Sequence, residues 1–234
     1  MIRIAQEFSR FADTYTQHNF IQVKVAKKLV SMLPEKIYDN ILDLGCGRGE
    51  VYRNLKDQKI IFEHLTAMDI SPEMLTLHPD DTRLVKVQGD FSHSQGLEGL
   101  PCQYYDLLLS ASALQWSSDL DLALSMLAPL SDKFYFAIFT SGTFRSLHHC
   151  AGINSPIYSE KLLKSQIAKH YDAVFETVHY TLHFNSVYKM LRYIKESGTS
   201  GGERRLSYAQ TKKLLETYPY DYLEFEVLFV SPKS

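Results

Sequence analysis

Residues 40–50 read Asn40-Ile41-Leu42-Asp43-Leu44-Gly45-Cys46-Gly47-Arg48-Gly49-Glu50. The apolar first half predicts a short buried strand, and the segment from Glu50 to Lys56 is expected to be helical. Three glycines at spacing two lie between them and let the turn pass close under a ligand, because no Cβ blocks the approach. The following helix offers free N–H groups and the positive end of its dipole. A strand, a glycine-rich turn and a helix form the opening unit of a doubly wound α/β domain that binds a ligand at the turn.

The spacing of the glycines separates two classes of ligand. A dinucleotide-binding turn has the pattern Gly-x-Gly-x-x-Gly, and Gly49 comes one residue too early for it. Gly-x-Gly-x-Gly after an Asp-ended strand is instead typical of S-adenosyl-L-methionine (SAM) methyltransferases, and the segment from Leu42 to Gly49 closely resembles that family. A glycine-rich turn without any ligand is the third interpretation. It is disfavoured because residues further along the chain fall where a bound ligand needs them.

Asp69 is the first of these residues. It follows a predicted strand over His64–Met68, in the place where such folds carry the acid that hydrogen-bonds the ribose hydroxyls. The alternative role, capping the next helix, is already supplied by Ser71 and Pro72. Ile70 beside it offers an apolar face to adenine.

The resemblance to the methyltransferases implies further cofactor contacts. Asp90 follows the predicted strand Arg83–Gln88 and is expected to reach the adenine amino group, with Phe91 against the ring. The end of the fourth strand, Tyr104–Ser110, borders the crevice of a doubly wound sheet and is expected to face the cofactor. The full set of implied cofactor-binding residues is Asp43, Gly45, Gly47, Asp69, Ile70, Asp90, Phe91 and Ser110.

The remaining pattern completes an α/β fold. Lys133–Phe139 predicts a fifth strand, and the alternating segments Ala173–Phe184 and Leu223–Val230 predict two more. Paired as a hairpin, these two place one antiparallel strand in an otherwise parallel sheet. Residues 5–33 have helical spacing with a polar break near Tyr15, where a lid over the ligand is expected.

The predicted fold is therefore a doubly wound, Rossmann-like sheet of seven mostly parallel strands, with an antiparallel last strand and an N-terminal helical lid. One methyltransferase domain is expected over residues 1–234. Within it, we expect the lid at 1–34, the SAM-binding core at 35–140, and a substrate-side insertion with the C-terminal hairpin at 141–234.

Several stretches together resemble one subfamily, the malonyl-carrier-protein O-methyltransferases of biotin synthesis. They are, in chain order, Phe8–Ala12 with Tyr15, His18 and Gln22, then Leu114–Trp116, and then Leu191–Thr199. The chain departs from the subfamily at Thr16, where Asp is usual, at Glu50, which replaces the usual Thr-Gly pair after the glycine turn, and over residues 140–150. These departures concern the substrate more than the class of reaction.

The resemblance implies an enzyme that uses SAM to convert the free carboxylate of malonyl-acyl-carrier protein to its methyl ester, an early step of biotin synthesis. Tyr15 and Arg145 are then expected at the reaction, with His18 and Trp116 beside them at the substrate. Arg145 follows the fifth strand, where a guanidinium fork can orient a carboxylate. The alternatives are a methyltransferase acting on a small-molecule carboxylate or another nucleophile, and a non-catalytic SAM-binding partner protein.

Composition excludes several classes of binding partner and indicates the cellular compartment. A net charge of −2 predicts neither a nucleic-acid binder nor a protein of the membrane surface, and no apolar run is long enough to span a bilayer. The three cysteines lack the spacing of a metal site, so no metal is expected. The first residues show no signal-peptide pattern, which together with the scattered cysteines favours a cytoplasmic protein. A monomer is expected, although the sequence does not determine the oligomeric state.

Overall fold

The structure, a computed structural model, describes residues 19–34, 36–196 and 206–233. Its centre is a sheet of seven strands in the order β3-β2-β1-β4-β5-β7-β6. β7 pairs antiparallel with β5 and with β6, whereas the other neighbours pair parallel. The predicted fold is therefore confirmed, including the single reversed strand. The strands are β1 Ile37–Leu44, β2 Ile61–Asp69, β3 Leu84–Gln88, β4 Leu107–Ala111, β5 Phe134–Phe139, β6 Ala173–His183 and β7 Tyr222–Pro232.

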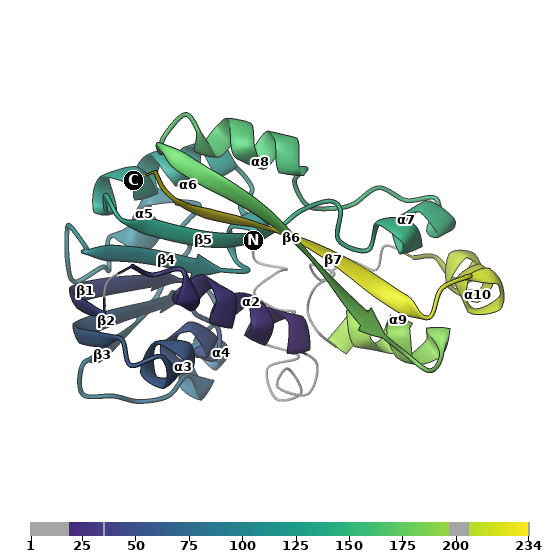
Figure 1. The fold of residues 1–234 in the computed structure, drawn as a ribbon, viewed down its shortest axis with the longest axis horizontal. Coiled ribbons are helices and arrows are strands. Elements are labelled where there is room, and N and C mark those ends of the chain that lie inside the picture. The colour runs from purple at the N-terminus through teal and green to yellow at the C-terminus, as the bar shows by residue number, and fades with distance from the viewer. Residues whose placement is uncertain (1–18, 35, 197–205, 234) are drawn as a thin grey trace.

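Helices cover both faces of this sheet (Figure 1). One face packs its apolar side chains, such as Ile41 and Leu109, against α2 and α3, while the other packs Leu42 and Phe136 against α6 and α8. The strand period of two sends neighbouring residues of β1 to opposite faces, so both become buried. The helices are α2 Phe20–Ser31, α3 Glu50–Asp57, α4 Pro72–Leu77, α5 Ser94–Leu97, α6 Leu120–Leu127, α7 Arg145–Ala151, α8 Glu160–Ile167, α9 Val187–Glu196 and α10 Tyr208–Thr217.

β6 and β7 form a long hairpin that extends past the rest of the sheet (Figure 1). The two strands pair from Ala173 with Pro232 to His183 with Tyr222, although β5 reaches only the later part of β7. The extension has its own packing: the ring of Phe225 on β7 lies against Phe144 and Tyr193, with ring centroids 5.0 and 6.3 Å away. α7, α9 and α10 thus form a lobe around the far end of the hairpin.

Helix ends agree with their capping residues. Ser71 accepts a hydrogen bond from the backbone N–H of Met74, and Pro72 occupies the first helical position, as the sequence predicts. Asp119 caps α6 in the same way. At the N-terminal side, α2 coincides with the second half of the predicted helical stretch 5–33, whereas the first half, with Tyr15 and His18, lies outside the described residues.

Candidate functional site

The glycine turn between β1 and α3 is built for close approach. Gly45, Gly47 and Gly49 have φ angles of +67°, +52° and +87°, a left-handed conformation that costs other residues free energy. A Cβ on Gly45 would overlap the Cβ of Ala113, which follows β4. A Cβ on Gly47 would instead meet no atom within 4 Å. Gly45 is therefore required by packing inside the protein, whereas Gly47 leaves its space open above the turn.

Asp69 ties the end of β2 to this turn. Its carboxylate accepts the backbone N–H of Gly47 at 2.8 Å and that of Ser71 at 2.9 Å. Burial raises the pKa of Asp69, while these backbone hydrogen bonds act in the opposite direction. Each carboxylate oxygen keeps a second lone pair, so the group can still accept a hydrogen bond from a ligand.

A cavity opens above the turn, with a volume of about 840 Å³ when the space at its mouth is included. It lies at the carboxyl ends of β1, β2, β3 and β4, where doubly wound folds bind their ligands. Seven residues that the sequence predicts for the site line it: Gly45, Gly47, Asp69, Ile70, Asp90, Phe91 and Trp116.

Two predicted cofactor residues lie behind the cavity wall. Ser110 is fully buried, and its hydroxyl donates to the carbonyl oxygen of Leu44 at 3.0 Å, which ties β4 to β1. Asp43 is also fully buried, and neither of its carboxylate oxygens has a hydrogen-bond partner among the described residues. Neither side chain is among those that line the cavity, so their direct contact with a cofactor stays a prediction.

The buried carboxyl group of Asp43 has a raised pKa. Burial first, and the nearby Asp69 carboxylate second, raise its pKa to about 8. An unfolded chain ionises an aspartate near pH 3.9, so between these two values the folded protein holds a proton that the unfolded chain has lost. The contribution of Asp43 to stability is therefore fully present below about pH 4 and is lost as the pH rises to about 8.

We expect Asp43→Asn to remove this dependence, because the amide has a similar shape and no charge. Each pH unit between the two pKa values changes the free energy of unfolding of the wild type by up to about 1.4 kcal/mol relative to the variant. Urea unfolding of both proteins at pH 5 and pH 8 measures the effect. The pKa of Asp69 is also raised, but Asp69 is present in both proteins, so its contribution to the pH dependence largely cancels in the comparison. A stability difference that is the same at both pH values would show that Asp43 is ionised throughout.

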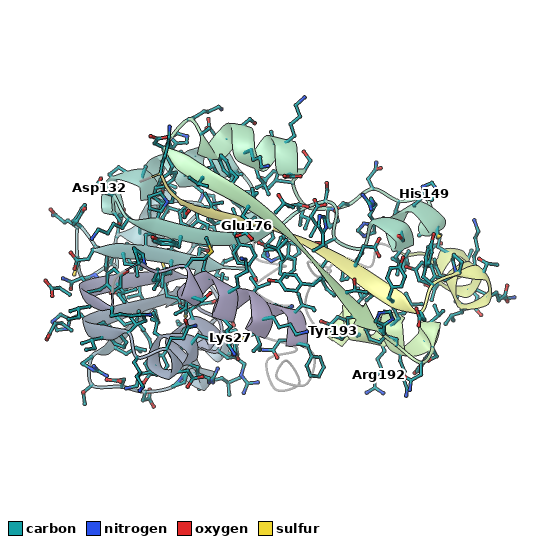
Figure 2. All side chains as sticks on the ribbon, in the orientation of Figure 1. Lys27, Asp132, His149, Glu176, Arg192 and Tyr193 are labelled. Atoms are coloured by element: carbon teal, nitrogen blue, oxygen red, sulfur yellow. The ribbon has the colours of Figure 1, made fainter. Side chains whose placement is uncertain are left out.

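The structure does not bring Arg145 to the cavity. It is the first residue of α7, its side chain is exposed, and it is not among the lining residues. The reason lies in the segment after β5. The backbone N–H of Phe144 donates to the carbonyl oxygen of Glu224 at 2.8 Å, and that of Thr140 donates to Glu226, so the chain folds back over β7. α7 consequently lies in the lobe beside α10, where Figure 2 labels His149 of the same helix.

Several lining residues were not predicted. Gln22 and Ala26 reach the cavity from α2, and Arg48 and Glu50 come from the turn and the first residue of α3. The others are Cys46, Val51, Met74, Ala111, Ser112 and Ala113. Arg48 and Glu50 had one visible signal, because Glu50 is a departure from the family pattern directly after the glycine turn. Nothing in the periodicity of α2 distinguishes Gln22 from a residue buried in the core.

Comparison with known proteins identifies the domain. Residues 42–130 match the family model described as "Methyltransferase domain". A malonyl-[acyl-carrier protein] O-methyltransferase of Erwinia billingiae is 32% identical over 160 residues, which cover 66% of this chain and 59% of that protein. The protein of the same name from Dechloromonas aromatica is 36% identical over 124 residues, covering 53% of this chain and 44% of that one.

Solved structures agree on the fold. A putative methyltransferase in complex with the Haloferax volcanii Trm112 methyltransferase activator superposes with a TM-score of 0.60 at 17% identity, covering 97% of this chain and 98% of that one. Residues 42–130 thus match a methyltransferase domain, and the chain resembles the malonyl-carrier-protein enzymes. It spans less than two thirds of the length of both curated relatives. Within the described ranges, no helix has the length and apolar character needed to cross a membrane.

Proposed function

We propose that this protein uses SAM to methylate the free carboxylate of a malonyl group on an acyl-carrier protein, in the cytoplasm and as a step of biotin synthesis. The observation that carries the proposal is the cavity above the glycine turn, lined by Gly47, Asp69 and Asp90, in a chain whose relatives bear that name. One domain over residues 1–234 would combine the SAM-binding core at 35–140 with substrate-side elements from 1–34 and 141–234.

The cavity fits the parts of SAM. The open space above Gly47 admits a ligand against the backbone, and Asp69 at 9% exposure offers acceptor lone pairs to the ribose hydroxyls. Ile70 and Phe91 supply apolar walls for adenine, next to the carboxylate of Asp90. Three acidic side chains line the cavity, namely Glu50, Asp69 and Asp90, which favours a ligand with a positively charged sulfonium. When bound, SAM supplies the methyl group already activated by that charge.

The methylation of a carboxylate requires little acid–base catalysis by the protein. The group is ionised at neutral pH, since its pKa is about 4, and needs no general base. What the protein contributes is orientation and partial removal of water, for which Trp116 provides a large apolar wall after β4. Orientation effects of this kind supply roughly 7–11 kcal/mol in well-aligned reactions.

A carrier-bound substrate would bring an acidic protein to the enzyme. α9 exposes Lys189, Arg192 and Lys195 on one face, and Figure 2 shows Arg192 pointing outward from the lobe, while Tyr193 beside it is buried. These charges would steer a negatively charged carrier, and steering of this kind weakens as salt screens it.

Methyl transfer from radiolabelled SAM to a panel of acceptors tests the proposal. We expect the largest kcat/KM for malonyl-carrier protein, a smaller value for a small malonyl thioester, and the least for free diacids. Raising the salt from about 0.05 to 0.5 M should lower kcat/KM for the carrier substrate more than for the thioester.

Other results of the same panel would support one of the alternative functions. A preference for free diacids would show a methyltransferase of small-molecule carboxylates. SAM binding without transfer to any acceptor would favour a non-catalytic binding protein. If salt affected the carrier and the thioester equally, the basic face of α9 would have no part in docking.

A further inference from the structure

Ser112 follows β4 directly and lines the cavity in a backbone conformation that is unusual for a residue with a side chain. Its φ angle is +64°, in the left-handed region that costs a serine free energy. Two hydrogen bonds hold the backbone there. The N–H of Ser112 donates to the carbonyl oxygen of Ala137 on β5 at 2.8 Å, and its own carbonyl oxygen accepts from the side-chain amide of Gln115 at 2.6 Å. Backbone strain that surrounding contacts hold in place is typical of functional sites.

The hydroxyl of Ser112 has no hydrogen-bond partner among the described residues, although its oxygen is buried. The same holds for the amide oxygen of Gln22, whose side chain is 7% exposed and lines the cavity from α2. Because α2 packs against β4, both of these polar groups belong to the wall of the cavity that α2 and the end of β4 form. A buried polar group without a partner costs free energy, and a ligand that hydrogen-bonds to both groups would recover that cost.

The order of the strands places this wall away from the residues proposed for adenine. The strands follow one another as β3-β2-β1-β4, and Phe91 and Ile70 come after β3 and β2. The glycine turn comes after β1, and Ser112 comes after β4, at the other end of the row. If adenine binds beside Ile70 and Phe91, the side of the cavity that remains for the methyl acceptor is the one that Ser112 and Gln22 line.

We infer that Ser112 and Gln22 bind the carboxylate of the methyl acceptor. The hydroxyl donates one hydrogen bond, and the amide, which can turn about its last bond, donates a second. Both donors are neutral, so they orient the carboxylate without neutralising its charge as an arginine would, and the carboxylate stays a better nucleophile. The pair thus takes the orienting role that the sequence predicted for Arg145, which does not line the cavity. This inference deepens the proposed function and rests on it, because the carboxylate belongs to that reaction.

Ser112→Gly tests the hydroxyl, because it should change stability and substrate binding in opposite directions. Glycine adopts a φ of +64° without strain, and the variant also removes a buried hydroxyl that has no partner among the described residues. We therefore expect the variant to unfold at a higher urea concentration than the wild type. KM for a small malonyl thioester should nevertheless rise about fivefold or more, because a donor to the carboxylate is lost.

A binding measurement gives the same information without turnover. Isothermal titration of the malonyl thioester into protein saturated with S-adenosylhomocysteine, which has no methyl group to transfer, reports the affinity for the acceptor alone. Ser112→Gly and Gln22→Leu should each weaken this binding about fivefold or more. Both variants should bind S-adenosylhomocysteine itself as the wild type does.

Ser131→Ala is the matched control, because it removes the hydroxyl of a buried serine outside the cavity. Ser131 donates to the carbonyl oxygen of Lys133 at 2.9 Å and is not among the lining residues. This variant should lose stability and keep the wild-type KM and thioester affinity.

Two results would overturn the inference. Unchanged thioester binding in Ser112→Gly and Gln22→Leu would remove the pair from the acceptor site, whatever their stability. A loss of S-adenosylhomocysteine affinity as large as the loss of thioester affinity would assign the pair to the cofactor instead. The failure of the proposed function is distinct: wild-type protein that binds both ligands and transfers no methyl group would overturn the reaction, whereas the binding role of the pair would stand.

Discussion

Gly45→Ala is expected to lower the free energy of unfolding by about 3 kcal/mol or more, the largest change we predict for a single methyl group in this protein. Two costs add. The Cβ would overlap that of Ala113, which sits on a segment fixed to the end of β4, and it would occupy a left-handed conformation at φ +67°. Urea unfolding monitored by circular dichroism gives the value.

A second substitution separates the two costs. Ala113→Gly removes the atom that the new Cβ would meet. The double variant Gly45→Ala/Ala113→Gly should therefore regain the stability lost to the overlap and keep only the cost of the left-handed conformation, about 1–2 kcal/mol. Gly47→Ala is the matched control for stability, because its Cβ would meet nothing within 4 Å and only the conformational cost remains. Equal losses in Gly45→Ala and Gly47→Ala would mean that the contact with Ala113 relaxes freely.

Asp69→Asn is expected to weaken S-adenosylhomocysteine binding about 10- to 100-fold, a loss of about 1.4–2.8 kcal/mol. The amide nitrogen cannot accept either of the two backbone N–H groups that the carboxylate now holds, so one of them loses its partner and the turn shifts. The ligand also loses a charged acceptor for its ribose hydroxyls. Isothermal titration measures the affinity, and urea unfolding confirms that the variant is folded.

Asp106→Asn provides the control for Asp69. Asp106 also accepts two backbone N–H groups, those of Asp39 and Asn40 at 3.1 and 2.7 Å, but it lies near the other end of β1 and outside the cavity. Both bonds go to the same oxygen, Oδ2, so the amide oxygen of Asn can keep them, and we expect the affinity for S-adenosylhomocysteine to be unchanged. An Asp69→Asn protein that binds the ligand as tightly as the wild type would remove Asp69 from the site.

The core of the site could be predicted because it depends on short-range rules. Glycine spacing marks the turn, and an acid directly after a parallel strand lies at the ligand end of the sheet in any doubly wound fold. Gly47, Asp69 and Asp90 therefore lie where the pattern indicated. Their contacts with a cofactor remain predictions, since lining a cavity is a statement about position.

What could not be predicted depends on how the chain packs between distant segments. Arg145 was placed near the site from its distance to β5, yet the hydrogen bonds from residues 140–146 to Glu224 and Glu226 carry it to the lobe around the hairpin. Gln22 reaches the cavity only because α2 packs over β4 and β5, beside α3. Neither fact is encoded in local periodicity, and the short helix α7 was missed for the same reason.

The insertion of β7 between β5 and β6 has a consequence for biosynthesis. Phe136 on β5 pairs with Val230, and Phe175 on β6 pairs with the same residue. Neither strand can form these pairs until β7 has been synthesised, because β7 follows both in the chain. Until then, β5 is an open edge whose six residues are all buried in the finished fold, and β6 has no sheet to join. A nascent chain of this architecture exposes an apolar strand edge from the synthesis of β5 until β7 is complete, and we expect chaperones to bind it during that interval.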